Sequence, residues 1–177
     1  MAKPTSMLPY RSQGYTLLEL LIVVMIILIF SGLLLAQYNS SNEQIKLKTE
    51  VQKLSGMLEL ARKKTLAHNT ISSCIGNFNG YQISLSANQY ALSYCCANDC
   101  NYSSIHTTTF PSTIRIMSPL VPNPYLIQFI PSFQGTTLGS DITVQIKNTA
   151  IPSTNKCIQL SISKIGIVTI NDAFISC

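Results

Sequence analysis

Six cysteines offer the most obvious chemistry in this chain. They are Cys74, Cys95, Cys96, Cys100, Cys157 and Cys177. The segment Cys95-Cys96-x3-Cys100 supplies three thiolates, and His106 would add the imidazole that completes a tetrahedral zinc site. All six cysteines, however, follow an apolar segment that we expect to place them outside the cytoplasm. An even number of cysteines in that location favours disulfides, so we predict disulfides and no bound metal.

The sequence leaves part of the disulfide connectivity open. We expect Cys74 to bond with either Cys95 or Cys96, and the other member of that adjacent pair to bond with Cys100. Adjacent residues of a strand point in opposite directions, so separate partners are natural for the pair.

The acidic residues of the C-terminal half show no catalytic pattern. Asp99, Asp141 and Asp172 lie far apart in turn-like contexts, which favours turn or capping roles. The sequence contains no nucleotide-binding loop, HExxH or G-x-S-x-G, and its two histidines exclude a large histidine-rich metal centre. A Cys–His nucleophile would need a free thiol, which a disulfide removes. We therefore predict no enzymatic activity and no cofactor, and keep a membrane-anchored periplasmic enzyme only as an alternative.

Glu19 is the charged residue of an otherwise apolar stretch, Tyr15 to Ala36. As a helix with a rise of about 1.5 Å per residue, this stretch would be about 33 Å long, enough to cross a bilayer core of about 30 Å. A carboxylate in such a segment costs several kcal/mol unless it is paired, so its presence indicates a function. The alternative is that Glu19, near one end, simply extends to the headgroups.

The residues on either side of this stretch predict its orientation. Lys3 and Arg11 precede it with no acid beside them, which places the N-terminus in the cytoplasm and the remainder outside. A cleaved secretory signal would have a shorter apolar region of about 7–15 residues and a small-residue cleavage site. Residues 33–37, Leu-Leu-Leu-Ala-Gln, match such a site poorly.

Length and composition limit the rest of the chain to one modest domain. The 177 residues carry 12 Lys and Arg against 7 Asp and Glu, and the charged fraction of 11% argues against disorder. The basic excess lies in residues 1–14 and 43–68, whereas the C-terminal part is close to neutral. This distribution weakens a nucleic-acid-binding interpretation of the domain as a whole.

An apolar stripe predicts an amphipathic helix that continues from the apolar stretch. Its positions alternate steps of four and three: Leu47, Val51, Leu54, Leu58, Ala61 and Thr65. No proline interrupts residues 15–68, so one helix is the simplest interpretation, and a β-sheet would cover its stripe. Arg62, Lys63 and Lys64 are candidates for contact with DNA or an acidic partner, and a solvated helix face is the alternative.

Strand patterns replace helical ones after about residue 70. Alternating apolar residues over 81–85 and 90–94 predict two strands joined by a hairpin at Ala87-Asn88. Further predicted strands are Thr113–Met117, Leu126–Ile130, Ile142–Ile146, Cys157–Ile162 and Ile165–Ile170. The predicted fold class is therefore α+β, a long N-terminal helix packed on a β-rich head.

The start of the apolar stretch resembles a known processing motif. Gly14-Tyr15-Thr16-Leu17-Leu18-Glu19, after a short basic leader, is similar to the cleavage and methylation motif of type IV pilins and type II secretion pseudopilins. The resemblance implies that a prepilin peptidase cuts between Gly14 and Tyr15 and methylates the new amine of Tyr15, where the family more often has Phe. It also implies that Glu19 meets the N-terminal amine of a neighbouring subunit during assembly, which would offset the cost of burying the carboxylate.

Shorter segments resemble the GspH/FimT-type minor pseudopilins. They are the stem segment at 60–67, the Phe129-Ile130-Pro131-Ser132-Phe133-Gln134-Gly135 run and Gly166-Ile167-Val168. A bridge between Cys157 and Cys177 would close a loop of about 20 residues, contribute roughly 3 kcal/mol and resemble the C-terminal loop of many type IV pilins. DNA-binding pilins of the FimT type carry arginine near the C-terminus, whereas residues 168–177 contain no base.

The resemblance also implies an organisation and a set of partners. Residues 1–14 would be the leader, 15–36 the transmembrane and filament-core helix, 37–69 the stem and 70–177 the disulfide-bonded head of a pilin-like fold. The expected partners are other pilin or pseudopilin subunits, prepilin peptidase and an inner-membrane assembly platform. The protein would span the inner membrane once, with its head in the periplasm, before it enters a filament. DNA capture in natural transformation is the alternative function.

Overall fold

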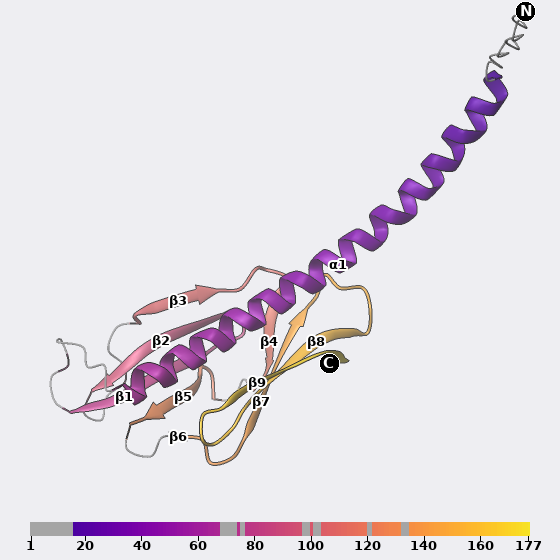
Figure 1. Cartoon of the computed structure of the whole chain (residues 1–177). Helices are drawn as coiled ribbons and strands as arrows, with labels where there is room; N and C mark the ends of the chain where they lie inside the picture. Colours follow the sequence, from indigo (N-terminus) through magenta and orange to yellow (C-terminus); the bar gives the residue numbers. More distant parts are fainter. Residues whose placement is uncertain are drawn as a thin grey trace, which may run out of the picture. The chain divides into compact units, whose positions relative to one another are not determined.

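The computed structural model describes residues 16–67, 74, 77–96, 100, 104–119, 122–131 and 135–177, without the side chains of 33–37. Helix α1 (Leu17–Leu66) is followed by strands only, within the described part of the chain (Figure 1). The strands are β1 (Phe78–Leu85), β2 (Gln89–Cys96), β3 (His106–Thr109), β4 (Ile114–Ser118), β5 (Tyr125–Ile130), β6 (Gly135–Thr136), β7 (Ile142–Asn148), β8 (Asn155–Ile162) and β9 (Val168–Ser176). The protein is an α+β protein with an N-terminal helix packed on a β-rich head, as the sequence predicts.

The chain divides into two compact units, residues 1–39 and 40–177. The first contains the N-terminal part of α1, and the second contains the rest of α1 together with all the strands. No helix in the described residues combines the length and the hydropathy needed to cross a membrane.

The strands of the second unit form two antiparallel sheets. One has the order β3-β2-β1-β5-β6 and the other β4-β7-β8-β9. The predicted hairpin joins β1 to β2, with Leu85 opposite Tyr90 and the Ser86 N–H donating to the Gln89 carbonyl at 2.9 Å. Alternate residues of the paired strands are buried, which gives each sheet one apolar face.

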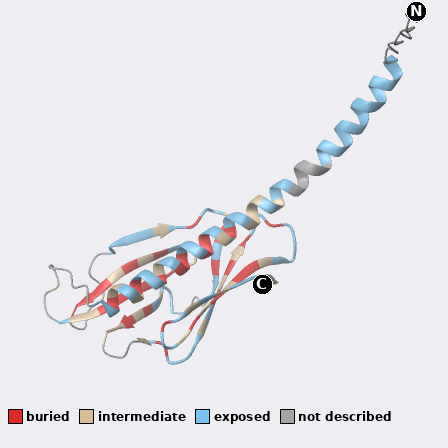
Figure 2. Cartoon of the chain, viewed as in Figure 1, coloured by how far each residue is buried: buried red, intermediate tan, exposed pale blue. Residues whose placement is uncertain are grey.

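The stripe of α1 and both sheets share one hydrophobic core. The predicted stripe residues Leu47, Val51, Leu54, Leu58, Ala61 and Thr65 are all buried. The five apolar residues of the stripe belong to one cluster with Tyr81, Ile127 and Leu160 from the strands, and Figure 2 shows buried residues of α1 where the helix runs along the strands. Burial of each large apolar side chain contributes about 1.5–3 kcal/mol, so the stripe is what attaches the helix to the head.

Thr65 shows how a polar residue fits into this stripe. Its hydroxyl donates to the Ala61 carbonyl at 2.9 Å and accepts from the Tyr81 backbone N–H at 3.2 Å. Thr65 and Tyr81 are both buried, and a buried hydroxyl or N–H without a hydrogen-bond partner would cost about 1–3 kcal/mol. The hydroxyl therefore joins the last turns of α1 to β1 without leaving a buried polar group unsatisfied.

The last strand differs from its prediction. Ile165–Ile170 was predicted as a strand, but residues 163–167 form a turn and β9 begins at Val168. Gly166 adopts a φ of +79° in that turn, and its N–H donates to the Ser163 carbonyl at 2.8 Å. From Val168 the chain returns along β8 to Ser176, because the pairing continues with Ser176 opposite Asn155.

Candidate functional site

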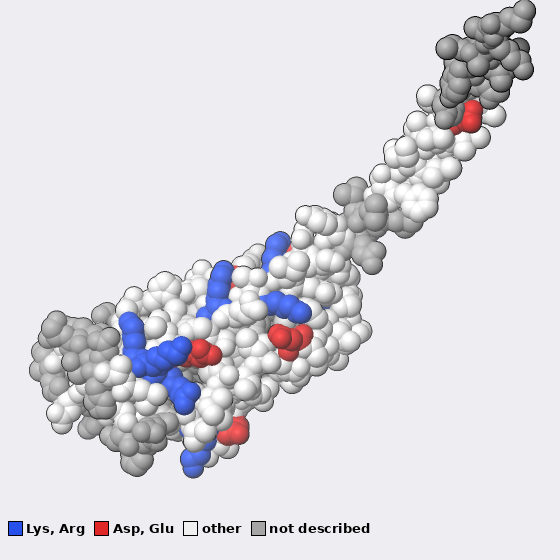
Figure 3. Space-filling model, viewed as in Figure 1, with Lys and Arg blue, Asp and Glu red and all other residues white. Residues whose placement is uncertain are grey.

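The N-terminal part of α1 presents an apolar surface on all sides. From Leu17 to Phe30 the large apolar side chains are exposed, with fractions between 46% for Val24 and 83% for Leu17. Figure 3 shows no Lys or Arg on the visible face of this part. A helix that is apolar all round is suited to burial among other apolar helices or lipid chains.

Glu19 lies in the first turn of this helix. Its backbone N–H donates to the hydroxyl of Thr16 at 3.3 Å and to the Thr16 carbonyl at 3.1 Å. Thr16 therefore acts as the N-cap, and the order Thr-x-x-Glu is that of a capping box. A carboxylate at this end also interacts favourably with the helix dipole, which stabilises the first turn by about 0.3–1 kcal/mol. The capping role was missed at the sequence level, although the T-x-x-E pattern carries its signal.

The predicted cleavage and methylation residues, Gly14 and Tyr15, lie outside the described residues, as does the rest of the leader. The described chain begins with Thr16, next to the predicted new N-terminus. Glu19 follows the predicted new N-terminal residue by four positions in the sequence.

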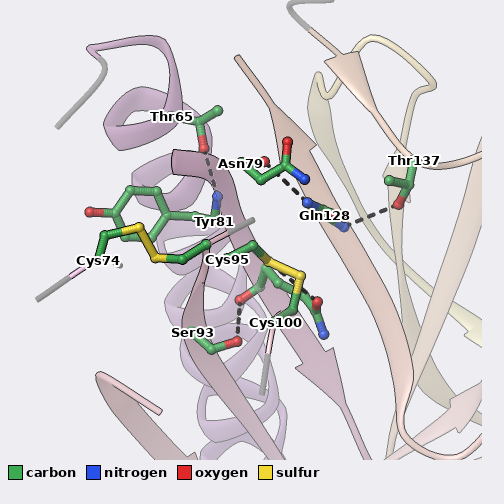
Figure 4. Close-up of a disulfide and its surroundings, with 11 residues drawn as sticks. Thr65, Cys74, Asn79, Tyr81, Ser93, Cys95, Cys100, Gln128 and Thr137 are labelled. Atoms are coloured by element: carbon green, nitrogen blue, oxygen red, sulfur yellow. Dashed lines mark hydrogen bonds between the residues drawn. A yellow bond between two sulfur atoms is a disulfide. The ribbon is translucent and has the colours of Figure 1, made fainter. Parts of the chain in front are cut away.

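Three disulfides join the six cysteines. Cys74 is bonded to Cys96, and Cys95 is bonded to Cys100. Of the two partners left open for Cys74, the structure has Cys96, and the adjacent residues of β2 have separate partners. Figure 4 shows Cys74, Cys95 and Cys100 near Tyr81, together with the hydrogen bond from the Tyr81 backbone N–H to the Thr65 hydroxyl. These sulfurs offer no thiolate to a metal, and His106 lies on the exposed strand β3.

The third disulfide, between Cys157 and Cys177, fastens the end of the chain to β8. The two cysteines lie 20 positions apart in sequence, and the loop between them contains the whole of β9. Among the described strands, β9 pairs with β8 alone. The disulfide therefore holds the end of an edge strand, where fraying would otherwise begin.

A polar cluster joins α1 to β7 at the start of the second unit. The side-chain amide of Asn148, fully buried, donates to the carboxylate of Glu43 and to its backbone carbonyl, each at 3.0 Å. Lys46 also donates to that carboxylate. The hydrogen bonds from Lys46 and then from Asn148 lower the pKa of Glu43 below its ordinary value of 4.5. This cluster was missed in the sequence because its members lie far apart along the chain.

Arg62, Lys63 and Lys64 have three different environments. Lys63 lies 3.8 Å from the carboxylate of Glu59, and both side chains are mostly exposed. The ammonium of Lys64 lies 5.7 Å from the ring centroid of Tyr81. Arg62 is partly buried, and its Nε–H has no hydrogen-bond partner in the described part of the chain. Consecutive helical residues point about 100° apart, so the three bases do not form one uniform basic face.

The predicted turn role fits Asp141, whereas it is wrong for Asp172, which lies within strand β9. The carboxylate of Asp141 accepts from the backbone N–H of Lys164 at 2.7 Å, which ties the β6–β7 segment to the turn before β9. Asp172 is exposed on β9, and Asp99 lies outside the described residues. Within the described residues, no three His, Cys, Asp or Glu side chains gather closely enough to hold a metal.

Comparison with known proteins finds a motif and a fold. The family model described as the prokaryotic N-terminal methylation motif matches residues 9–35. A crystal structure of the type IV minor pilin FimU of Pseudomonas aeruginosa PAO1 in space group P21 matches with a TM-score of 0.54 and 14% identity, over 73% of this chain and 90% of that one. Its P65 form matches with a TM-score of 0.51 and 14% identity, over 71% and 92%. No curated protein sequence matches the chain significantly. The chain thus has a type IV pilin-like fold, and its N-terminal part carries an N-terminal methylation motif.

Proposed function

We propose that this protein is a minor pilin or pseudopilin, a non-enzymatic subunit of a type IV pilus or of a type II secretion pseudopilus. One observation supports this above the others: a methylation motif over residues 9–35 leads directly into the helix of a chain whose fold is like that of a type IV minor pilin. A processing motif without the fold, or the fold without the motif, would be much weaker support.

Processing is the first step of the proposed function. Prepilin peptidase would cut between Gly14 and Tyr15 and methylate the amine of Tyr15. A glycine before the scissile bond lets an extended backbone enter a protease site without side-chain hindrance. The bases of the leader would stay on the cytoplasmic side, the apolar residues in the inner membrane and the head in the periplasm.

Assembly would then move the apolar helix from lipid into a filament core. Residues 17–30 expose large apolar side chains all round, so sister helices of other pilins would replace lipid contacts. The carboxylate of Glu19 would pair with the N-terminal amine of a neighbouring subunit. A subunit out of register would leave both charges unpaired in a low-dielectric core, and this cost would select the correct register.

The disulfide at the C-terminus favours a pilus over a secretion pseudopilus. The Cys157–Cys177 bond closes a loop like the C-terminal loop of many type IV pilins. Deletion of the gene distinguishes the two: loss of surface pili with normal protein export indicates a pilus subunit. Failure to export folded proteins with pili intact indicates a pseudopilin, and DNA retention by the head that salt abolishes would indicate capture of DNA.

Substitution of Glu19 tests the proposed role in assembly. Glu19→Val should be cut and methylated normally but should enter filaments at least about tenfold less, because the unpaired amine is then buried. Mass spectrometry of the N-terminus and immunoblots of sheared filaments measure the two steps. Asp172→Val, which removes an exposed carboxylate of the head, is the control and should assemble normally. Normal entry of Glu19→Val would remove the register role. Retention of the first fourteen residues in cells with active peptidase would refute the proposed function.

A further inference from the structure

An open cavity of about 230 Å³ lies beside the last turns of α1. Its lining comes from α1 and from the turn that leads into β9: Glu59, Arg62, Lys63, Leu66, Ile167 and Val168. The volume far exceeds the roughly 30 Å³ share of one water molecule, and it is below the roughly 300 Å³ typical of small-molecule sites. It is therefore large enough to admit a side chain of another protein.

Arg62 lies in the lining of this cavity and has an incomplete set of hydrogen bonds in the described part of the chain. Within the described residues its Nε–H is buried and without a hydrogen-bond partner. A buried donor left unpaired costs about 1–3 kcal/mol, and native structures satisfy nearly all such groups. The guanidinium is always charged and presents its donors in a flat fork that matches the two oxygens of a carboxylate.

The remaining lining residues limit the charge and polarity of a ligand that fits this cavity. Lys63 adds a second positive charge, and Glu59, 3.8 Å from it, reduces the net charge of the lining to one positive charge. Leu66 and Ile167 are both 43% exposed and add apolar surface at the cavity. A single negative charge next to an apolar group is complementary to this surface in both charge and polarity.

We propose that this cavity binds an Asp or Glu side chain, flanked by an apolar residue, from another protein subunit. The inference rests on the proposed function, because neighbours in a filament would supply such a segment. A nucleic acid is the poorer match. Its phosphates require several cations along one surface, whereas the lining supplies Arg62 and Lys63, and Lys64 lies over Tyr81.

Binding of end-blocked peptides to the full chain in detergent micelles tests this proposal. The probe is acetyl-Leu-Glu-Leu-amide, and its control is acetyl-Leu-Gln-Leu-amide, which lacks the charge. The measurement is the ¹⁵N–¹H cross-peak of the Arg62 Nε–H. We expect the Glu peptide to shift this cross-peak, with a dissociation constant in the low millimolar range, and to bind at least about fivefold more tightly than the Gln peptide.

Matched variants assign the effect to the cavity. Arg62→Gln should weaken binding of the Glu peptide at least about tenfold, because it removes both the charge and the unpaired donor. Arg115→Gln, on the exposed face of β4, should leave it unchanged. The urea midpoint checks that each variant folds. If Arg62→Gln does not fold, the comparison of the two peptides on the unaltered chain decides.

Three results would overturn the proposal. They are equal affinity for the two peptides, no shift of the Arg62 cross-peak at about 10 mM peptide, and tighter, salt-sensitive binding of duplex DNA at the same cross-peak. The outcome is separable from the proposed function. A chain that enters filaments but binds no peptide refutes only the cavity, whereas a chain that binds peptide but is never processed refutes only the filament role.

Discussion

At the residue scale, the cluster around Asn148 shows how one buried amide sets the position of a helix. The side-chain NH₂ of Asn148 donates to two oxygens of Glu43. The side-chain oxygen of Asn148, Oδ1, accepts from the Ala150 backbone N–H at 2.9 Å. The amide thereby joins the end of β7 to a residue near the start of the second unit. Because the helical carbonyl of Glu43 is one of its acceptors, the contact fixes the backbone of α1 and not only a side chain.

The lowered pKa of Glu43 predicts a pH dependence of stability. A carboxyl whose pKa is lower in the folded than in the unfolded chain stabilises the fold at pH values above its unfolded pKa. That contribution is lost as the pH falls from about 4.5 through the folded pKa. Urea unfolding between pH 7 and pH 3 should therefore show the free energy of unfolding falling less steeply on the acid side for Glu43→Gln than for the unaltered chain.

Glu59→Gln is the control for this prediction. Its carboxylate lies 3.8 Å from Lys63 in an exposed pair, and such pairs contribute about 0–1 kcal/mol. Between pH 7 and pH 3, the free energy of unfolding of Glu59→Gln should fall as steeply as that of the unaltered chain. If the free energy of unfolding fell equally steeply with falling pH for Glu43→Gln and for the unaltered chain, the role of the Glu43 cluster would be contradicted.

At the element scale, the accuracy of the sequence prediction follows the strength of each periodic pattern. The stripe from Leu47 to Thr65 has a helical period and is buried at every predicted position, because one face of α1 meets the core. Strand β3 was not predicted, since its His-Thr-Thr-Thr sequence is polar on both faces of an exposed edge. β6 has only two residues, too few for any pattern.

The polar contacts between distant elements were the other part that the sequence did not predict. The Glu43–Asn148 cluster, the Thr65–Tyr81 hydrogen bond and the cavity beside Arg62 each join residues from different elements. Their positions depend on the relative placement of helix and sheets, which a local pattern does not encode. The capping role of Thr16, by contrast, is local and was recoverable from the T-x-x-E spacing.

A small substitution at Gly80, in β1, is expected to lower the stability of the protein strongly. Its φ is +113°, and an added Cβ would lie 1.9 Å from the carbonyl oxygen of Phe129 on β5. Gly80→Ala should therefore destabilise the protein by about 4 kcal/mol or more, as strain and a backbone clash combine. Urea unfolding of the detergent-solubilised chain measures this. Gly56→Ala is the control, with open space around it on α1, and should stabilise by up to about 1 kcal/mol.

Two of the disulfides are expected to contribute different amounts to the free energy of unfolding. The Cys157–Cys177 bond spans 20 positions and the Cys95–Cys100 bond spans 5, so chain entropy assigns them about 3 and about 2 kcal/mol. Each pair has one buried cysteine, Cys157 or Cys95, which makes the two double alanine variants comparable. The Cys157→Ala, Cys177→Ala variant should lose more unfolding free energy in urea. The reverse order would show that the C-terminal bond adds little to the attachment of β9.

At the scale of the whole molecule, the two units differ in how they satisfy their apolar surface. In the described residues the buried apolar side chains run from Leu47 to Ile162, all inside the unit of residues 40–177. The described part of the first unit leaves its large apolar side chains exposed. One unit therefore completes its core within the chain, and the other requires apolar surroundings that the chain itself does not supply.

This difference predicts which fragment folds. Residues 40–177, produced in an oxidising compartment, should unfold in urea in one cooperative transition, with circular dichroism and tyrosine fluorescence coincident. A fragment of residues 67–177 keeps the described strands and the three disulfides but loses the stripe of α1. At about 1.5–3 kcal/mol for each of the four large apolar side chains, the loss is about 6–12 kcal/mol, which equals the whole stability of a typical domain. The shorter fragment should therefore bind a hydrophobic dye and lack a cooperative transition. Cooperative unfolding of residues 67–177 would show that the sheets bury a sufficient core without α1.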